Sequence, residues 1–520
     1  MKATAPTTLA LSTLSSRAQQ HSDIKVWVLY FPGWHDCGWQ RSRGDRTGWE
    51  RVQKAQSKGE WHHQPLVPMW GYQDEADPKK FEVKIDAAAD HGIDAFLFYW
   101  FYRTDSKWGR PGKGLADALD KGYLKASNRD RIDFAIVWTC HYDVKYAPSE
   151  FETLAEDIVR DYFPEPTYMK TDKGEPVFFV YHGARGPENG MGPEHREILR
   201  QKTIDAGFPG LKIRMVKNHW YGPGFSSWQP PSPYGNYVEF RDKAIAAGEK
   251  GQSSNYHAFL DVGVDTSPWG DTATGIWIGN TPEVIEETLR MLADTIKKKK
   301  TEKVIVINNW NEWGEGAYLE PATWADPYIL SPDDLRLDAA SCHSFKTAIQ
   351  NNTDDTAAKL YWTTTSDATW NDAKSQAFAI KPNSGFTTYT VDLSGHAAWT
   401  GTIKQLRFDV LDGADSQGTV SLDFVHLTSA DGAPVIGWEF NRDDDREGWK
   451  LHNLEANLAH IFKRDGNLHE GTFGGKLNLR RGYGMGYLEA IRAVFGDKQR
   501  PTPTSAPTTH PNTKDASPAE

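Results

Sequence analysis

The stretch VIVINNWNEWGEGAYLEP, residues 304–321, joins four consecutive β-branched residues to a loop rich in Asn, Trp and Gly. Short apolar runs that are bounded by turn residues are typical of buried strands in a parallel sheet. The loop carries two carboxylates, Glu312 and Glu315, shortly after the run ends. The stretch therefore predicts a core strand over residues 304–307 that delivers two acidic side chains to one edge of a sheet.

Upstream of this stretch, apolar runs alternate with segments of helical period. Six further runs lie at residues 26–30, 95–99, 134–138, 177–181, 213–216 and 259–262. Amphipathic helices are expected at residues 78–91, 148–162, 193–206, 237–250 and 282–299. Such alternation is typical of an α/β fold, and the number of repeats predicts a (β/α)8 TIM barrel over residues 22–330. An eighth strand does not stand out in the sequence, and a doubly wound sheet is the alternative fold.

Polar and aromatic residues follow most of the predicted strands. In a TIM barrel the active site is built at the C-terminal ends of the strands, so these residues are candidates for substrate binding. The candidates are Trp34, His35, Tyr99, Trp100, His141, His219, Asp265, Asn311 and Trp313.

Some of these candidates have more than one interpretation. No HxxxH or HExxH spacing joins His35, His141 and His219, so we expect no metal site, and these residues either contact sugar hydroxyls or have a structural role. Asp265 precedes the sequence TSPW and either binds a hydroxyl or caps a turn. No cofactor is expected.

Glu312 and Glu315 are the candidate catalytic residues. Cleavage of a glycosidic bond needs one acid to protonate the leaving oxygen and a second group to handle the positive charge that develops on the sugar. We expect the Trp residues around the pair to raise one pKa by burial, and Asn side chains and backbone N–H groups to keep the other carboxyl ionised. The alternative is a pair of solvated loop glutamates without a chemical role.

The motif NWNEWGEGAYLEP, residues 309–321, resembles the end of the barrel in glycoside hydrolase family 99-like proteins. That group includes endo-α-mannosidases and polysaccharide-associated members that are sometimes described as glycosyltransferases. Four more segments follow the order that such proteins show, and the five together are spread over most of residues 24–325. The four are YFPGWHDCGW (30–39), QPLVPMWGYQDEAD (64–77), IDAAADHGIDAFLFYW (85–100) and VGVDTSPW (262–269).

The resemblance implies a retaining glycosidase barrel in which the two glutamates of the motif act together. Carried over to this chain, it implies that Glu315 is the general acid/base and that Glu312 engages the 2-hydroxyl of the sugar, through an anhydro-sugar intermediate. Characterised mannosidases usually have His where this chain has Gly314, so the resemblance does not extend to α-mannoside specificity.

Three functions compete at this point. The leading one is a glycoside hydrolase that acts on a polysaccharide or oligosaccharide. The second is a glycosyltransferase in polysaccharide biosynthesis. Metal-dependent transferases often carry a DxD-type diphosphate site, and the DxD pattern of this chain, Asp443 and Asp445, lies outside the predicted barrel, which argues against this function. The third is a non-catalytic carbohydrate-binding protein, for which the carboxylate pair would be unnecessary.

Beyond residue 330 the sequence changes to short alternating strands, such as residues 387–391, 405–410 and 419–427, separated by Gly, Thr, Ser and Asp. Residues 331–481 are predicted to form an antiparallel β-sandwich that resembles a carbohydrate-binding module. The resemblance implies that residues 482–497 are the closing helix of the barrel, so the sandwich would be an insertion. Residues 498–520 are expected to be a disordered tail, and residues 1–21 a leader or disordered segment.

Composition excludes several classes of protein. Lys and Arg number 59 against 70 Asp and Glu, and a net charge of −11 disfavours nucleic acid as a partner. No run of about 20 apolar residues is present, so no membrane span is expected. The 21 Trp residues favour a sugar ligand, while the sequence leaves the oligomeric state open. The weak apolar stretch near the N-terminus favours a secreted or periplasmic protein over a cytoplasmic one.

Overall fold

The computed structural model describes most of the chain. The described residues are 21, 23–55, 66–103, 112–139, 146–181, 191–216, 220–221, 235–250, 257–272, 275–324, 328–412, 419–440, 446–452, 455–456, 477–480 and 485–496. Two candidate residues, His141 and His219, lie outside the described residues, as do residues 1–20 and the predicted tail.

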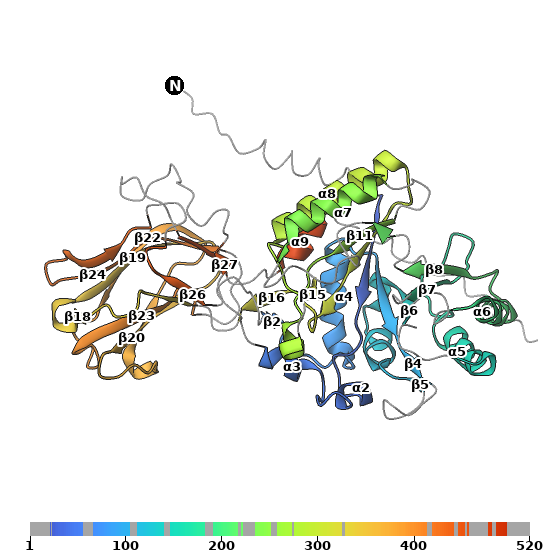
Figure 1. The fold of residues 1–520 in the computed structure, drawn as a ribbon, viewed down its shortest axis with the longest axis horizontal. Coiled ribbons are helices and arrows are strands. Elements are labelled where there is room, and N and C mark those ends of the chain that lie inside the picture. The colour runs from blue at the N-terminus through green and yellow to red at the C-terminus, as the bar shows by residue number, and fades with distance from the viewer. Residues whose placement is uncertain are drawn as a thin grey trace, which may run out of the picture.

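A sheet of eight parallel strands forms the centre of the N-terminal part of the protein (Figure 1). Its strand order is β8-β7-β6-β3-β1-β13-β11-β9. The strands are β1 (Lys25–Tyr30), β3 (Ala95–Trp100), β6 (Asp133–Thr139), β7 (Val177–Tyr181), β8 (Lys212–Val216), β9 (Trp220–Tyr221), β11 (His257–Asp261) and β13 (Val304–Asn308). All seven apolar runs of the sequence are therefore strands of one parallel sheet.

The strand order indicates a sheet that curls like a TIM barrel. The first strand, β1, pairs with β3 on one side and with the last strand, β13, on the other. The strands at the two ends of the sheet, β8 and β9, follow one another in the chain. An open doubly wound sheet does not bring its first and last strands together in this way. The strand β9 is only two residues long, too short for an alternating pattern to reveal it in the sequence.

Helices connect most of the strands. They are α2 (Gly38–Arg41), α3 (Trp49–Lys54), α4 (Pro78–Asp90), α5 (Pro148–Asp161), α6 (Pro193–Asp205), α7 (Tyr237–Lys250) and α8 (Pro282–Lys299). Between β3 and β6 the described connection consists of short helical turns at Ala118–Gly122, Tyr123–Lys125 and Arg129–Arg131. Another such turn spans Ser267–Thr272. No helix in the described part of the chain is long and apolar enough to cross a bilayer.

Local sequence signals explain where the long helices begin and end. The side chain of Asp77 caps α4 by accepting a hydrogen bond from the backbone N–H of Lys79. Thr281 caps α8 in the same way, and Pro282 occupies the first turn. At the other end of α8, three lysines face the negative end of the helix dipole, and Lys300 adopts a left-handed conformation.

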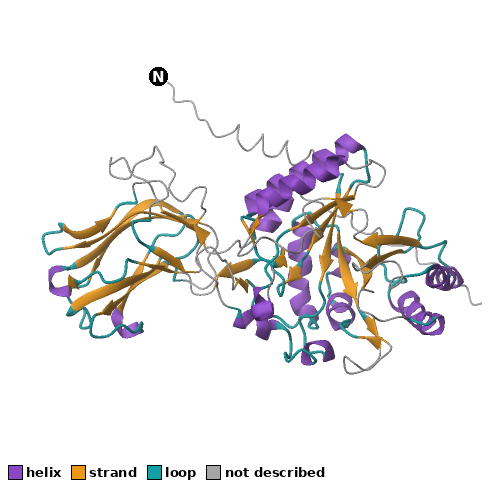
Figure 2. Cartoon of the chain, viewed as in Figure 1, coloured by secondary structure: helices purple, strands orange, loops and turns teal. Residues whose placement is uncertain are grey.

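Residues 328–480 contain two antiparallel sheets, which we call the C-terminal β-region (Figure 2). The first sheet consists of β17 (Tyr328–Leu330), β18 (Leu337–Asp338), β20 (Ala357–Thr364), β21 (Ser375–Ala379), β23 (Thr402–Asp409) and β26 (Lys450–His452). The second consists of β19 (Ser344–Asn351), β22 (Ser384–Asp392), β24 (Thr419–Thr428), β25 (Pro434–Trp438), β27 (Glu455–Ala456) and β28 (Leu477–Arg480). Short helical turns lie at Ala339–Ser341 and Asp372–Lys374.

The two sheets of the C-terminal β-region share one apolar core. Leu360 and Phe408 from the first sheet belong to the same buried cluster as Phe345 and Val425 from the second. Four of the five Trp residues in this region are buried in that core. They are Trp362, Trp399, Trp438 and Trp449, whereas Trp370 is half-buried.

The last helix, α9 (Gly486–Phe495), packs on the N-terminal part of the protein, next to α8 (Figure 1). Its Leu488, Ile491 and Phe495 side chains are buried in the same cluster as the parallel sheet. The hydroxyl of Tyr487 donates a hydrogen bond of 2.5 Å to the carbonyl of Asn280. The chain thus leaves the parallel sheet, forms the C-terminal β-region and returns to pack against the helices around that sheet.

Four further pairs of short strands lie outside these sheets. They are β2 (Leu66–Pro68) with β16 (Ala322–Trp324), β4 (Tyr102–Arg103) with β5 (Gly112–Lys113), β10 (Gly235–Asn236) with β12 (Trp277–Ile278), and β14 (Asn311–Glu312) with β15 (Ala317–Tyr318). The last pair carries the candidate catalytic residues.

Candidate active site

The hairpin formed by β14 and β15 follows β13 directly, at the C-terminal edge of the parallel sheet. The peptide bond between Asn308 and Asn309, at the end of β13, is cis. In the turn of the hairpin, Gly316 has a φ of +68°, and a Cβ atom there would lie 2.4 Å from the backbone nitrogen of Asp265. Only glycine fits such a position, so the hairpin packs closely against the loop that follows β11.

Burial alternates along the first half of this hairpin. Asn311 and Trp313 are completely buried, whereas Glu312 between them is half-buried, and so is Glu315 in the turn. Successive side chains of an extended chain point to opposite faces. The hairpin therefore has an inner face that carries Asn311 and Trp313, and an outer face that carries the glutamate pair.

The side chain of Asn311 ties the inner face to the end of β1. Its amide oxygen accepts a hydrogen bond of 2.8 Å from the backbone N–H of Phe31, and its Nδ2 donates to the Phe31 carbonyl at 2.8 Å. The same Nδ2 lies 3.0 Å from Oε1 of Glu75. The backbone carbonyl of Asn311 accepts a hydrogen bond of 2.7 Å from the indole of Trp34. Because its polar groups are used within the protein, Asn311 has a structural place in the site.

Trp313 holds the hairpin in place on the other side of Glu312. Its indole Nε1 donates a hydrogen bond of 2.8 Å to Oε2 of Glu320, and its ring stacks on Tyr318 with 4.0 Å between centroids. The side chain has no exposed face to offer a sugar, because it is completely buried.

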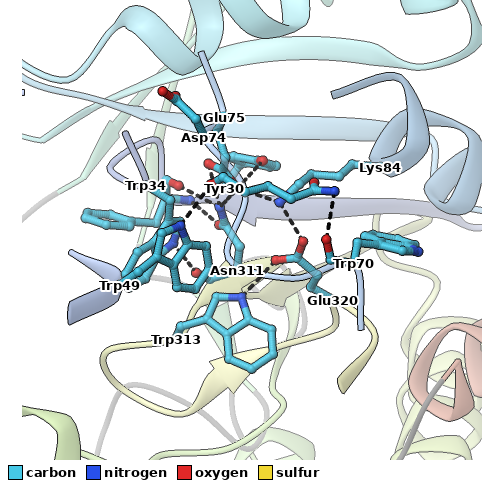
Figure 3. Close-up of polar contacts among 12 residues, drawn as sticks. Tyr30, Trp34, Trp49, Trp70, Asp74, Glu75, Lys84, Asn311, Trp313 and Glu320 are labelled. Atoms are coloured by element: carbon cyan, nitrogen blue, oxygen red, sulfur yellow. Dashed lines mark hydrogen bonds and ion pairs between the residues drawn. The ribbon is translucent and has the colours of Figure 1, made fainter. Parts of the chain in front are cut away.

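Glu75 and Glu320 are bridged by Lys84, which projects from α4 (Figure 3). The Nζ atom of Lys84 lies 2.6 Å from Glu75 Oε1 and 2.5 Å from Glu320 Oε1, and the exposed fractions of the side chains are 0%, 0% and 1% for Lys84, Glu75 and Glu320. The hydroxyl of Tyr30 donates a further hydrogen bond of 2.9 Å to Glu75. Burial raises the pKa of Glu75 to about 7, against the opposing effect of the Lys84 ammonium. We call Glu75, Lys84 and Glu320 the buried triad.

The glutamate pair on the outer face has a different environment. Among the residues that the structure describes, no side chain or backbone group donates a hydrogen bond to the carboxyl of Glu312 or Glu315. Burial raises the pKa of Glu315 to about 7, and burial together with the charge of Glu315 raises the pKa of Glu312 well above its usual range. Two carboxyls that interact so strongly titrate as one unit, and the pair holds a proton near neutral pH.

This finding corrects one expectation from the sequence. Both pKa values are raised, and among the described residues no Asn side chain donates to either carboxyl. Asn308 and Asn311 donate to other groups, and Nδ2 of Asn309 has no hydrogen-bond partner in the described part of the chain. The opposing effect comes from arginines, because the charge of Arg43 lowers the pKa of both glutamates and that of Arg51 lowers the pKa of Glu312.

The two arginines are stacked on aromatic rings beside the pair. The Arg43 guanidinium lies 4.2 Å from the ring centroid of Trp39 and 5.0 Å from that of Trp269, and Arg51 lies 4.5 Å from Trp269. A Cβ atom on Gly314 would lie 3.7 Å from the indole nitrogen of Trp269. Trp269 therefore covers the turn of the hairpin at Gly314.

A row of polar groups lines the ends of the strands close to the pair. The carboxyl of Asp261, at the end of β11, accepts a hydrogen bond of 3.3 Å from Nδ2 of Asn308. The hydroxyl of Tyr99 lies 3.5 Å from Oδ1 of Asn308. Burial raises the pKa of Asp261 to about 8, and the charge of Glu315 adds to this shift. The charges of both catalytic candidates also raise the pKa of Tyr99, so this row lies within the electrostatic range of the pair.

The remaining candidates are placed as follows. Trp34 is buried and stacks on Trp49 with 4.1 Å between centroids. His35 is buried, which lowers its pKa, and its Nδ1 has no hydrogen-bond partner among the described residues. Trp100 donates its indole N–H to the hydroxyl of Tyr162 at 3.1 Å, so its polar edge is used within the core.

Asp265 has the contact that its turn-capping interpretation predicts. Its carboxylate accepts a hydrogen bond of 2.8 Å from the backbone N–H of Ser267, while its own N–H donates to the carbonyl of Glu315 at 2.7 Å. In the described part of the chain, no three His, Cys, Asp or Glu side chains are grouped so that they could hold a metal ion.

Sequence reasoning missed Asp261, the two arginines and the buried triad. A signal for Lys84 was present, because Phe81, Lys84, Ile85 and Ala88 fall at helical spacing and form the buried stripe of α4. A lysine within such a stripe requires buried carboxylates, since an unpaired ammonium is too costly to bury. Asp261 lies inside the predicted strand at residues 259–262, where an acidic residue is flanked by apolar ones, and it is the last residue of β11.

Comparison with known proteins gives a family match. The sequence model of a family described as "Glycosyltransferase WbsX" matches residues 28–223 and 234–331. These residues include all five segments on which the resemblance to glycoside hydrolase family 99-like proteins rests, and that resemblance is confirmed. The match extends over most of the parallel sheet and the whole of the β14–β15 hairpin.

Curated relatives and solved structures are more distant. Proteins named "Uncharacterized protein WxcX" from two strains of Xanthomonas campestris pv. campestris are 22% identical over 344 residues, which cover 56% of this chain and 47% of each relative. This chain thus matches about half the length of those relatives. A GH99 endo-α-mannosidase from Bacteroides thetaiotaomicron is 15% identical, with a TM-score of 0.34 over 58% of this chain and 88% of that chain. A "glycoside hydrolase-like protein" is 14% identical, with a TM-score of 0.38 over 57% and 87%.

Proposed function

The chain belongs to the family described as glycosyltransferase WbsX, and on that premise we propose that it is a carbohydrate-active enzyme whose chemistry is done by Glu312 and Glu315. The reaction that the site supports best is hydrolysis of a glycosidic bond in a polysaccharide or oligosaccharide, with retention at the anomeric carbon. The observation that carries this proposal is the half-buried glutamate pair, which receives no hydrogen bond from described residues and whose pKa values are raised by burial.

The reaction requires one protonated and one ionised carboxyl, and a glutamate pair that holds one proton can supply both. The proposed roles need the proton of the coupled pair to lie on Glu315, with Glu312 ionised, when the substrate is bound. In the first step, Glu312 then removes the proton of the sugar 2-hydroxyl, whose oxygen attacks the anomeric carbon, while Glu315 gives its proton to the leaving oxygen. In the second step, Glu315 takes a proton from water, the water oxygen opens the anhydro ring, and Glu312 returns its proton to the 2-oxygen. A Glu315 pKa of about 7 suits a group that must act first as an acid and then as a base.

The description of the family supports a second candidate, a glycosyltransferase. The same pair could activate a sugar hydroxyl in place of water in the second step, which would transfer the glycosyl group to an acceptor saccharide. The distinction depends on what occupies the position of the attacking water.

A substrate screen tests both candidates. The protein is incubated with a panel of bacterial and plant polysaccharides, with and without sugar nucleotides, and the products are separated by mass. New reducing ends without a sugar nucleotide support hydrolysis, and products longer than the acceptor support transfer. Binding of a polysaccharide without any product would overturn both proposals in favour of a carbohydrate-binding protein.

We also propose that residues 22–330 and 482–497 together form a closed (β/α)8 barrel, into which residues 331–481 are inserted as a carbohydrate-binding-like β-sandwich. Burial of α9 supports this division, because Leu488, Ile491 and Phe495 would each lose about 1.5–3 kcal/mol of burial free energy without the barrel. A chain that ends before Tyr483 should melt at a clearly lower temperature than one that ends after Asp497. Equal melting temperatures would contradict the proposed boundaries.

A further inference from the structure

The two residues that flank Glu312 in the chain are each held by a different carboxylate of the buried triad. Asn311 donates to Glu75 at 3.0 Å, and Trp313 donates to Glu320 at 2.8 Å. Glu312 itself receives no such bond from the described residues. The direction in which Glu312 points is therefore determined by what holds its neighbours.

Lys84 forms ion pairs with both Glu75 and Glu320, the carboxylates that hold Asn311 and Trp313 (Figure 3). Glu75 lies just before α4 and Lys84 on α4, whereas Glu320 lies after the β14–β15 hairpin, so the contacts connect two parts of the chain that are 236 positions apart at Lys84 and Glu320. Without the ammonium, two buried carboxylates would face each other at short range, which is strongly unfavourable. The lysine thus allows Glu75 and Glu320 to lie close together, where they accept hydrogen bonds from Asn311 and Trp313, the residues on either side of Glu312.

We propose that Glu75, Lys84 and Glu320 are positioning residues that fix the orientation of Glu312 by holding Asn311 and Trp313. This inference rests on the role proposed for Glu312. The triad touches no substrate, because it is completely buried on the inner face of the hairpin, and it acts through the backbone of the hairpin. A triad with a purely structural role would stabilise the protein without any special effect on this hairpin.

A pair of triple variants separates the two roles. Glu75→Gln/Lys84→Met/Glu320→Gln removes all three charges but keeps oxygen acceptors for Asn311 and Trp313. Glu75→Met/Lys84→Met/Glu320→Met removes the charges and the acceptors together. Replacement of a buried charged triad by neutral residues of similar volume is often tolerated, so both proteins are suitable for comparison. Arg407→Met/Asp409→Asn, which removes a largely buried ion pair in the C-terminal β-region, is the control.

Hydrogen exchange of the full-length protein gives a readout that does not depend on activity. In the Met variant we expect the backbone amides of residues 309–320 to exchange at least about tenfold faster than in the wild type, with other segments unchanged. The Gln variant and the control should stay within about threefold of the wild type. Equal exchange in the Met and Gln variants, or faster exchange spread over the whole N-terminal part, would overturn the positioning role.

The kinetic readout uses whichever saccharide the substrate screen identifies. We expect kcat of the Met variant to fall about 10- to 100-fold with KM within about threefold, because the hairpin no longer aims Glu312 at the reacting atoms. Faster hairpin exchange with an unchanged kcat would also overturn the inference. If the wild type hydrolyses nothing, the function proposed above fails, while hydrogen exchange still decides whether the triad holds the hairpin.

A single substitution covers the case in which the Met variant does not fold. Trp313→Phe removes one N–H donor and keeps an aromatic ring, so the hydrogen bond to Glu320 is the polar contact that is lost. Trp399→Phe removes a buried indole donor from the C-terminal β-region and is the matched control. Faster exchange at residues 309–320 in Trp313→Phe, but not in Trp399→Phe, is expected; the same exchange in both would contradict the inference.

Discussion

A pair of glutamates lies at each face of the β14–β15 hairpin, and the two pairs differ in burial and in hydrogen bonding. On the inner face, Glu75 and Glu320 are completely buried, share the ammonium of Lys84 and accept hydrogen bonds from protein donors. On the outer face, Glu312 and Glu315 are half-buried and accept none from the described residues. Both pairs lie beside the same hairpin.

The difference shows how a protein can use one type of side chain both for structural support and for chemistry. A carboxylate whose oxygens are already bonded to donors of its own protein has little capacity left to bind or protonate a substrate. A carboxylate without such donors is costly to the fold and is available for chemistry, as is common at active sites. We therefore expect substitutions on the outer face to affect the reaction, and substitutions on the inner face to affect stability and the hairpin.

The largest effect is expected on the rate of the reaction, from substitutions on the outer face. Glu315→Gln should lower kcat about 10²- to 10⁴-fold on a natural saccharide, and much less on an activated aryl glycoside, because a good leaving group does not need the proton. Glu312→Gln should lower the rate on both substrates. Steady-state kinetics on the two substrate types measures this, and equal losses in both variants on both substrates would contradict the assigned roles.

The second effect concerns stability and the inner face. Lys84→Met should lower the free energy of unfolding by about 3–5 kcal/mol, because it leaves two buried carboxylates without their counter-charge. Lys79→Met on the same helix removes an exposed ion pair with Glu82 and should change it by no more than about 1 kcal/mol. Denaturant unfolding of both variants measures the contrast. A loss of similar size in both would mean that the triad is no more important than a surface pair.

The third effect is the pH dependence of stability. Burial raises the pKa of Glu315 to about 7 in the folded protein, whereas an unfolded glutamate titrates near pH 4.3. Between these values the folded state keeps a proton that the unfolded state has lost, so stability falls as pH rises from about 4.5 to 7. Glu312→Gln/Glu315→Gln should lose less stability than the wild type over this range in melts at pH 5, 6 and 7. A steeper loss in the double variant would contradict the burial effect.

The smallest effect is expected for the arginines beside the outer face. Arg43→Gln removes a charge that lowers the pKa of both glutamates, so the acidic limb of the pH–rate profile should move upward by a few tenths of a pH unit. Arg46→Gln removes an exposed arginine of the same loop that is paired with Asp36, and it should leave the profile unchanged. A downward shift in Arg43→Gln would show that its charge does not act on the pair.

The sequence by itself determined the parallel sheet and the position of the glutamate pair. Its seven apolar runs are strands because continuous β-branched and aromatic residues must be buried on both faces of a sheet, a local property that pattern alone reveals. The motif around Glu312 and Glu315 was evident because so many Trp, Asn and Gly residues directly follow a core strand. The segments that carry the family resemblance all lie within the family match.

Only the tertiary structure decided which glutamates are available for chemistry. The contacts of Asn311 join residues as much as 280 positions apart, as in Asn311 with Phe31, so no local pattern contains them. Burial and hydrogen bonding of a carboxyl depend on what the rest of the chain brings against it, and these set its pKa and its freedom to act. For that reason the sequence could identify Glu312 and Glu315 as candidates, while the fold assigned Glu75 and Glu320 to the opposite face of the same hairpin.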